Sequence, residues 1–196
     1  MIKICLTGGP SGGKSSCIVA VKAALEQAGY SVSIVEECAT KLIKQGYAIG
    51  QNISIREFQK LVFALQLQTE KALEAEAKNR SEKAVMICDR GFMDQCAYLA
   101  KSEMLEIAKE HGMAERDMLL DYDAVVHLVT AAIGTDCYTT ANNAARKETA
   151  EEAVRLDRAT LAAWQGHDHL YVIDNSTDFP GKVQRVVHTI YRILGI

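Results

Sequence analysis

The sequence predicts an α/β fold in which a five-stranded parallel sheet is covered by helices on both faces. Five short apolar runs are spaced along the chain, helix-like segments separate them, and most runs end in glycine, acidic or other polar residues. Continuous apolar runs are typical of strands buried on both faces, and their alternation with helices favours parallel connections. The expected strands are 2–6, 31–36, 84–88, 124–129 and 170–173.

The first strand leads into a glycine-rich stretch that fits the phosphate-binding pattern G-x-x-x-x-G-K-[ST] at every fixed position: Gly8-Gly9-Pro10-Ser11-Gly12-Gly13-Lys14-Ser15. Glycines let backbone N–H groups turn toward phosphate oxygens, and a helix from Lys14 to about Ala28 would point its positive end at the same anion. We expect Lys14 on the terminal phosphates, Ser15 on Mg²⁺ and Ser16 among the nucleotide-binding residues. An ordinary glycine-rich turn is the alternative. The pattern predicts a three-layer P-loop NTPase.

The second strand ends in Glu36-Glu37, after which a helix of about two turns runs toward Gly46. A carboxylate at this strand end is placed to accept the proton of an attacking hydroxyl. Acids at a helix start are also favoured by the helix dipole, so a capping role stays open for both. Glu37 is the preferred candidate base.

The third strand follows a long amphipathic helix expected from Ile55 to about Arg80, and it ends in Asp89-Arg90. An acid directly after an apolar strand is the usual ligand that positions Mg²⁺, although Asp89 is also suited to cap the next helix. Arg90 is expected to hold the acceptor or the transferring phosphate, with a solvent-facing arginine as the alternative.

The later segments predict supporting and closing roles. Helical sequence is expected at 92–110, 114–120, 147–164 and 179–194, whereas the segment at about 130–147 has no sustained period. A segment of that length between elements favours a mobile lid. Arg146 in the lid, with Arg155 and Arg158 beyond it, would neutralise charge between the phosphates; exposed helix arginines are the alternative. Asn175, after the fifth strand, is expected to touch the nucleotide base, or to form an ordinary turn.

Composition limits the class of protein. A chain of 196 residues that is 48% hydrophobic is expected to form one domain over residues 1–196. A net charge of −3 gives no electrostatic case for nucleic acid or a membrane surface. Six scattered cysteines without C-x-x-C indicate reduced thiols, and no signal peptide or spanning run is recognisable, so we expect a cytoplasmic protein. Trp164 is expected in the core, the pair His167 and His169 in a turn, and the oligomeric state stays open.

Several stretches beyond the phosphate loop are distinctive: Ile87-Cys88-Asp89-Arg90-Gly91 with Met93-Asp94, Val126-His127-Leu128-Val129 with Ala131-Ala132, Asn143-Ala144-Ala145-Arg146, Ala163-Trp164-Gln165-Gly166-His167 and Val172-Ile173-Asp174-Asn175-Ser176-Thr177. With them the chain resembles, nearly end to end, the P-loop ATPase/kinase-like domain shared by two proteins. These are the bacterial NAD-biosynthesis regulator, in its nicotinamide riboside kinase part, and the animal TRPL translocation-defect protein. The last four stretches point to the translocation-defect branch.

The resemblance implies a nucleoside-kinase-like fold that binds a purine nucleotide, ATP or GTP, with Mg²⁺. It supports roles for Lys14, Ser15, Asp89 and Arg146, and it matches Glu37 rather than Glu36 to the acid after the second strand. The animal proteins carry a further β-barrel domain after this one, and the given sequence stops before it, so whether phosphoinositide binding carries over stays open.

The expected function is therefore a Mg²⁺-dependent phosphotransferase that acts on a small hydroxyl acceptor such as a nucleoside. The alternative is an ATP- or GTP-hydrolysing switch that acts through a protein partner. Glu37 and the arginine-bearing lid favour the phosphotransferase, and the absence of a base-reading N-K-x-D pattern disfavours a Ras-like switch.

Overall fold

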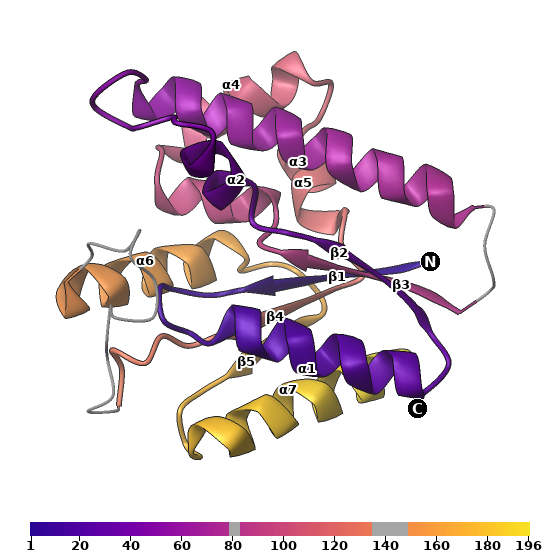
Figure 1. Cartoon of the computed structure of the whole chain (residues 1–196). Helices are drawn as coiled ribbons and strands as arrows, with labels where there is room; N and C mark the ends of the chain where they lie inside the picture. The colour runs from indigo at the N-terminus through magenta and orange to yellow at the C-terminus, as the bar shows by residue number, and fades with distance from the viewer. Residues whose placement is uncertain (79–82, 135–148) are drawn as a thin grey trace.

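A five-stranded parallel sheet forms the centre of the molecule, with the strands in the order β2-β3-β1-β4-β5 (Figure 1). The structure is a computed structural model and describes residues 1–78, 83–134 and 149–196. All neighbouring strands pair in parallel. The α/β prediction and its five strands are thus confirmed, and the strands are β1 (Ile2–Thr7), β2 (Ser31–Val35), β3 (Ala84–Asp89), β4 (Ala124–Leu128) and β5 (Leu170–Ile173).

Helices cover both faces of this sheet (Figure 1). Side chains alternate along β1, so that Ile4 and Leu6 pack against one layer of helices and Cys5 packs against the other. The first layer holds α1 (Lys14–Gln27) and α7 (Phe179–Leu194). The opposite side holds α2 (Cys38–Lys44), α3 (Ile55–Ala77), α4 (Lys101–Glu110), α5 (Glu115–Leu120) and α6 (Ala150–Ala163). Burial of both faces explains why the central strands β1, β3 and β4 are continuous apolar runs.

The long helix α3 begins at a capping box formed by Ser54 and Glu57. Ser54 Oγ accepts a hydrogen bond from the Glu57 N–H at 3.2 Å, and Glu57 Oε2 accepts one from the Ser54 N–H at 3.2 Å. This reciprocal pair satisfies two donors that a helix start would otherwise leave open. No helix in the described ranges is long and apolar enough to cross a bilayer.

The single helix expected over 92–110 is wrong, because the segment divides into the 3₁₀ helix η1 (Phe92–Ala97) and α4. Tertiary contacts hold the first part. Asp94 Oδ2 accepts hydrogen bonds from the Gly91 N–H at 3.0 Å and from Trp164 Nε1 at 3.0 Å. The Tyr122 hydroxyl accepts the Phe92 N–H at 3.2 Å. These partners lie outside the segment, so its own periodicity carries no sign of the break.

Candidate functional site

The phosphate-binding pattern forms a tight loop between β1 and the first turn of α1. Gly8 has a φ of 130°, and a Cβ atom there would lie 2.1 Å from the Leu128 carbonyl oxygen. At Gly9 a Cβ atom would lie 2.7 Å from Asp157 Cβ. The backbone therefore approaches its neighbours more closely than other residues allow, which explains the glycines. The loop ends at the N-terminus of α1, where backbone N–H groups favour an anion.

Lys14 lies against the loop that precedes it. Its Nζ donates hydrogen bonds to the carbonyl oxygens of Gly8 at 2.9 Å and Gly9 at 3.1 Å. Burial and, next, the nearby Arg90 cation lower the pKa of Lys14 to about 8, although Asp89 and Glu37 oppose the shift. A phosphate anion beside this amine would favour its charged form. The pattern's lysine is thus buried in the loop that is expected to hold phosphate.

Arg90 joins residues from three strand ends. Its Nε donates to Glu37 Oε1 at 2.5 Å, and its Nη1 donates to Asp94 Oδ1 at 3.2 Å and to the Gly8 carbonyl oxygen at 3.4 Å. The structure therefore brings together Glu37 and Arg90, which the sequence singled out separately. Charge-assisted contacts of this kind fix both the position and the direction of a guanidinium group.

Glu37 and Glu36 differ in environment. Burial alone would raise the pKa of Glu37, but Arg90, Lys14 and a hydrogen bond from Thr40 Oγ1 at 2.6 Å outweigh it and lower the pKa to about 2. Glu37 is thus an anion at neutral pH. The Glu36 side chain is 72% exposed and lies 3.3 Å from Lys41 Nζ. Of the two adjacent acids, Glu37 is therefore the one directed into the site.

Asp89 and Ser15 fit a magnesium site beside the phosphate loop. Asp89 Oδ1 is buried and has no hydrogen-bond partner in the part of the chain that the structure describes. Burial raises the pKa of Asp89 to about 6, and the Lys14 cation opposes that shift. Ser15 is exposed in the first turn of α1, as is Ser16. Mg²⁺ prefers hard oxygen ligands and takes most of them from water and phosphate, so one carboxylate and one hydroxyl suit it.

Asp94 is a site residue to which the sequence reasoning gave no role of its own. It is 1% exposed and accepts hydrogen bonds from Thr7 Oγ1 at 2.5 Å and from Trp164 Nε1 at 3.0 Å, besides its contact with Arg90. Trp164 is fully buried, which confirms its expected place in the core. The sequence signal that was available for Asp94 is an acid that directly follows two apolar residues, Phe92 and Met93.

Asp157 was also missed, although it touches the phosphate loop. Its Oδ1 accepts the Gly9 N–H at 2.9 Å and the Thr130 N–H at 2.8 Å, and it lies 3.3 Å from His127 Nε2. Asp157 thereby ties α6 to the loop and to the end of β4. The available signal was an acid on the buried face of α6, beside Ala153, Leu156 and Thr160.

Asn175 has a structural task in this arrangement. Its Nδ2 donates to the carbonyl oxygens of Thr130 at 2.8 Å and Ile133 at 2.7 Å, and its Oδ1 accepts from Lys182 Nζ at 2.7 Å. These bonds brace the chain after β4, so a contact with the nucleotide base stays a prediction. The expected turn at His167 is formed, with the His169 N–H donating to His167 Nδ1 at 3.0 Å.

The arginines expected near the lid are not placed in the site. Arg146 and most of the segment at about 130–147 lie outside the described residues. Arg155 is 58% exposed and pairs with Glu152 at 2.7 Å, and Arg158 is exposed. The structure thus gives Arg155 and Arg158 the surface positions that the alternative reading expected.

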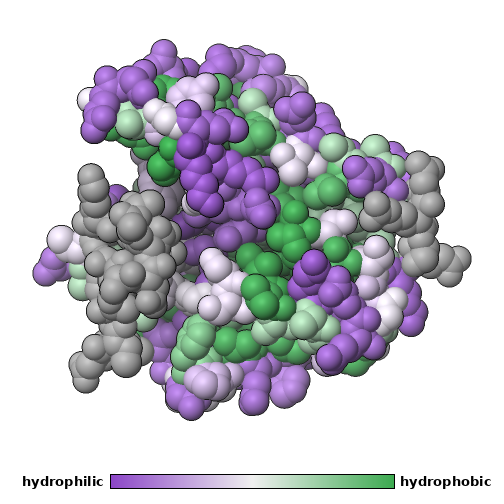
Figure 2. Space-filling view, in the orientation of Figure 1, coloured by the Kyte–Doolittle hydropathy of each residue, from purple (hydrophilic) through white to green (hydrophobic). Residues whose placement is uncertain are grey.

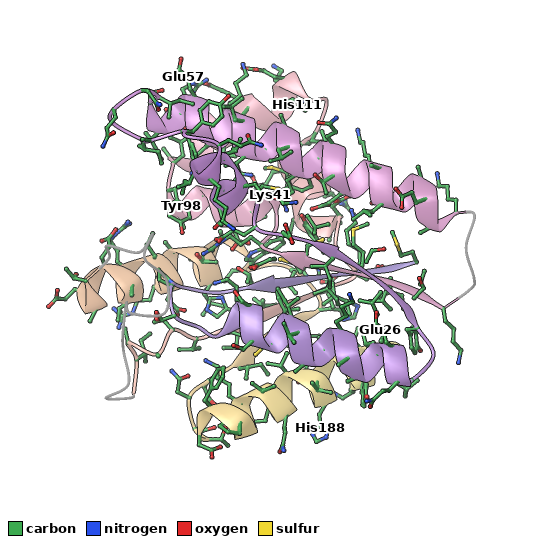
Figure 3. The ribbon with its side chains drawn as sticks, viewed as in Figure 1. Glu26, Lys41, Glu57, Tyr98, His111 and His188 are labelled. Atoms are coloured by element: carbon green, nitrogen blue, oxygen red, sulfur yellow. The ribbon has the colours of Figure 1, made fainter. Side chains whose placement is uncertain are left out.

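A cavity of about 210 Å³ borders the phosphate loop at Pro10. Asp89 and Arg90 lie on its wall, and apolar side chains from α2 and α3 form much of the rest. Figure 3 shows Tyr98, another wall residue, between α2 and α6. In Figure 2 the surface is hollowed on this side, below α2 and α3. A second molecule can therefore lie directly beside the expected phosphates.

Comparison with models of known protein families places most of the chain in one family. A family model described as AAA domain matches residues 3–182, from the first strand to the start of α7. No curated protein matches the chain. The match spans the phosphate loop, all five strands and the residues that surround Arg90. The chain belongs to the AAA domain family of P-loop nucleotide-binding proteins.

Proposed function

We propose that this chain is a Mg²⁺-dependent phosphotransferase that moves the γ-phosphate of ATP or GTP to a small hydroxyl acceptor, such as a nucleoside. The observation that carries the proposal is the cavity of about 210 Å³ that borders Pro10, Asp89 and Arg90. A nucleotide switch uses water as its acceptor and needs no second pocket beside the phosphates. The resemblance to the riboside kinase part of the bacterial regulator supports the same reaction.

The nucleotide would be bound by residues at the ends of β1 and β3. The loop amides and Lys14 would hold the triphosphate, and the Lys14 ammonium would exchange its bonds to Gly8 and Gly9 for phosphate oxygens. Ser15 and Asp89 would hold Mg²⁺, which when bound offsets the charge that develops between the phosphates.

The acceptor would lie in the cavity with its hydroxyl toward Glu37. A pKa of about 2 makes Glu37 a weak base. In a loose phosphoryl-transfer transition state the attacking bond is little formed, so orientation of the hydroxyl counts for more than the strength of the base. Arg90, held by Glu37 and Asp94, would orient the acceptor and the transferring group. Arg146 is proposed to complete the site from the expected lid.

The same proposal places the protein in the cytoplasm. The described cysteines are free thiols, and four of them, Cys5, Cys17, Cys38 and Cys88, are buried. Free buried thiols suit a reducing compartment, in which disulfides are rare.

Acceptor-dependent turnover tests the proposed reaction. The purified chain is incubated with Mg²⁺ and ATP or GTP, with and without a pool of small hydroxyl compounds, and nucleotide consumption and product masses are measured. A phosphotransferase consumes nucleotide faster with its acceptor and forms one phosphorylated product per nucleotide consumed. Slow hydrolysis that no acceptor changes, without a phosphorylated product, would overturn the proposal in favour of a switch. Lys14→Ala controls for a contaminating activity.

A further inference from the structure

The charges on the cavity wall restrict what the acceptor can be. Among the described residues that line it, three carboxylates, Glu37, Asp89 and Asp94, face a single cation, Arg90. That cation is already engaged, at 2.5 Å from Glu37 and 3.2 Å from Asp94. Carboxylates therefore outnumber cations at this wall, and the guanidinium is held by two of them.

Such a wall is unsuited to a phosphorylated acceptor. Sites that bind a phosphate group do so with arginine or lysine donors whose charge is available to it. A monophosphate in this cavity would add negative charge beside three carboxylates and would compete with Glu37 and Asp94 for Arg90. The wall therefore disfavours an acceptor that carries a phosphate or another anionic group.

The remaining wall favours an apolar or aromatic body. Phe58 and Val62 of α3 are buried in it, and Ile43 of α2 lines it although this side chain is 46% exposed. Tyr98, which is 38% exposed, lies on the same wall. Apolar and aromatic side chains around a few polar groups are the usual lining of a small-molecule site.

Gln95 is the unexplained polar group of this wall. It is 4% exposed, and neither Oε1 nor Nε2 has a hydrogen-bond partner in the ranges that the structure covers. Because both atoms are unpartnered, the conclusion is the same for either orientation of the amide. A buried polar group without a partner is costly and needs an explanation, and a ligand that satisfies it is one.

Gln66 shows what a structural glutamine looks like in the same cavity. It is 3% exposed, and its Nε2 lies within hydrogen-bond distance of Glu70 Oε1 at 2.9 Å, the Arg90 carbonyl oxygen at 3.0 Å and the Tyr122 hydroxyl at 3.1 Å. Gln66 is thus part of the scaffold, whereas the Nε2 donor and the Oε1 acceptor of Gln95 are both available to a ligand. Their complement on a ligand is a carbonyl next to an N–H group.

We propose that the acceptor is a molecule without anionic groups that has an aromatic or apolar body and an amide-type edge, as in a nucleobase or a small carboxamide, and that Gln95 binds this edge. That the bound molecule is the phosphate acceptor rests on the proposed function, whereas the class of ligand follows from the cavity.

Matched ligands test the class. Binding to the full chain with Mg²⁺ and a non-hydrolysable ATP analogue is measured by calorimetry for nucleosides, their 5′-monophosphates, benzamide, and a riboside that carries phenyl in place of a base. We expect nucleosides or benzamide to bind. The phenyl riboside should bind at least roughly tenfold more weakly, the worth of one lost hydrogen bond. The monophosphates should bind at least as weakly, because their charge has the same sign as the carboxylates of the wall. Binding of benzamide without nucleosides would identify a carboxamide source. Monophosphates that bind as well as nucleosides, or no binding by any neutral probe, would overturn the assignment.

Two leucine variants test Gln95. Gln95→Leu removes an unpartnered amide, so we expect its melting temperature to be equal to or above that of the wild type, with the preference for the base over phenyl lost. Gln66→Leu breaks a satisfied network and should lower the melting temperature. Unchanged discrimination in Gln95→Leu would exclude Gln95 as the binding residue. Neutral ligands that bind without forming a phosphorylated product would contradict the proposed function and leave the ligand assignment standing.

Discussion

Arg90 has a backbone φ of 79°, a region that residues other than glycine rarely adopt. Its guanidinium group bridges Glu37 and Asp94, two acids from different segments of the chain. Three further donors, the Trp164 indole, the Thr7 hydroxyl and the Gly91 N–H, hold Asp94 in place. Strained backbone that is fixed by several contacts is often found at functional sites, where it holds a group ready for use. The position of Arg90 therefore depends on both acids.

Replacing Glu37 by glutamine tests the proposed base. The change keeps the shape and removes the charge, so we expect acceptor phosphorylation to fall by roughly 10²-fold, the lower end of the range for general-base catalysis, because a carboxylate of low pKa is a weak base. Nucleotide affinity should change little, because Lys14 and the loop amides hold the phosphates. Steady-state kinetics with a saturating acceptor measure the effect.

Glu36→Gln is the matched control, since this acid is adjacent but 72% exposed. We expect wild-type transfer from it. Loss of transfer in Glu36→Gln alone would show that the wrong acid has been assigned.

The same acid predicts a pH effect on stability. The pKa of Glu37 is lowered from 4.5 to about 2 in the folded protein, so its ionised form stabilises the fold above about pH 4.5, and this contribution is lost as the pH falls toward 2. We expect the wild type to exceed Glu37→Gln by about 1–3 kcal/mol in free energy of unfolding near pH 6, and the gap to close at acid pH. Denaturant unfolding of both proteins between pH 6 and 2.5 measures it. A gap that stays constant with pH would exclude the ion pair as its cause.

At the scale of elements, α6 is joined to the phosphate loop by one side chain. Asp157 Oδ1 accepts both the Gly9 N–H and the Thr130 N–H, although Gly9 and Asp157 are 148 positions apart. The helix that follows the expected lid is therefore anchored to the backbone that would bind phosphate. A change at Asp157 should affect both the fold and the loop.

Asp157→Ala leaves two buried N–H groups without an acceptor. We expect it to lower the free energy of unfolding by about 2–6 kcal/mol, from one to three for each orphaned donor, and to weaken nucleotide binding. Asp157→Asn keeps an acceptor oxygen and should lose less of both. Denaturant unfolding and nucleotide titration measure the two effects.

Arg155→Ala, on the exposed side of α6, is the control and should change stability by less than about 0.5 kcal/mol. Full nucleotide affinity in a folded Asp157→Ala protein would show that the loop does not need this anchor.

The features of the fold that could be predicted from the sequence are those that depend on neighbouring residues. The central strands β1, β3 and β4 were recognisable because burial on both faces requires an apolar run. The phosphate loop was recognisable because its glycines and Lys14 have fixed spacing. The tasks of Asp94 and Asp157 were not predictable, since their partners lie far away in the sequence. For the same reason, the position of Asn175 after β5 was predictable, but its hydrogen bonds to the segment that follows β4 were not.

For the whole molecule, strand order decides which residues can act together. β3 and β4 flank β1 in the sheet, so Asp89 and Thr130 lie on either side of the phosphate loop. Glu37 follows the edge strand β2 and reaches the loop through Arg90. On the other side, Asn175 after β5 supports the segment after β4. The proposed chemistry thus lies on the β2-β3-β1 side, and the β4-β5 side provides support.

Nucleotide binding at this edge should stabilise the whole fold, because a ligand that binds only the native state raises the free energy of unfolding. At a concentration of about 100 times Kd the gain is roughly 2.7 kcal/mol. We expect a thermal shift with ATP or GTP in the wild type and none in Lys14→Ala. The variant should keep its fold because, among the described residues, Lys14 Nζ donates only to the carbonyl oxygens of Gly8 and Gly9. Differential scanning fluorimetry against both nucleotides measures the shift, and an equal shift in Lys14→Ala would contradict the assignment of the loop.

The contribution of magnesium can be separated by the same measurement in EDTA. Asp89 Oδ1 is buried without a partner in the described chain, which suits a carboxylate that acquires its partner with the nucleotide. The wild type should therefore lose part of its nucleotide-induced shift when Mg²⁺ is removed. Asp89→Asn removes the charge but keeps the size, so its shift should be close to that of the wild type in EDTA and should gain little from Mg²⁺. An Asp89→Asn protein with the wild-type Mg²⁺ titration and turnover would exclude Asp89 as a magnesium ligand. The capping role that the sequence left open would not replace it, because η1 is capped at Gly91.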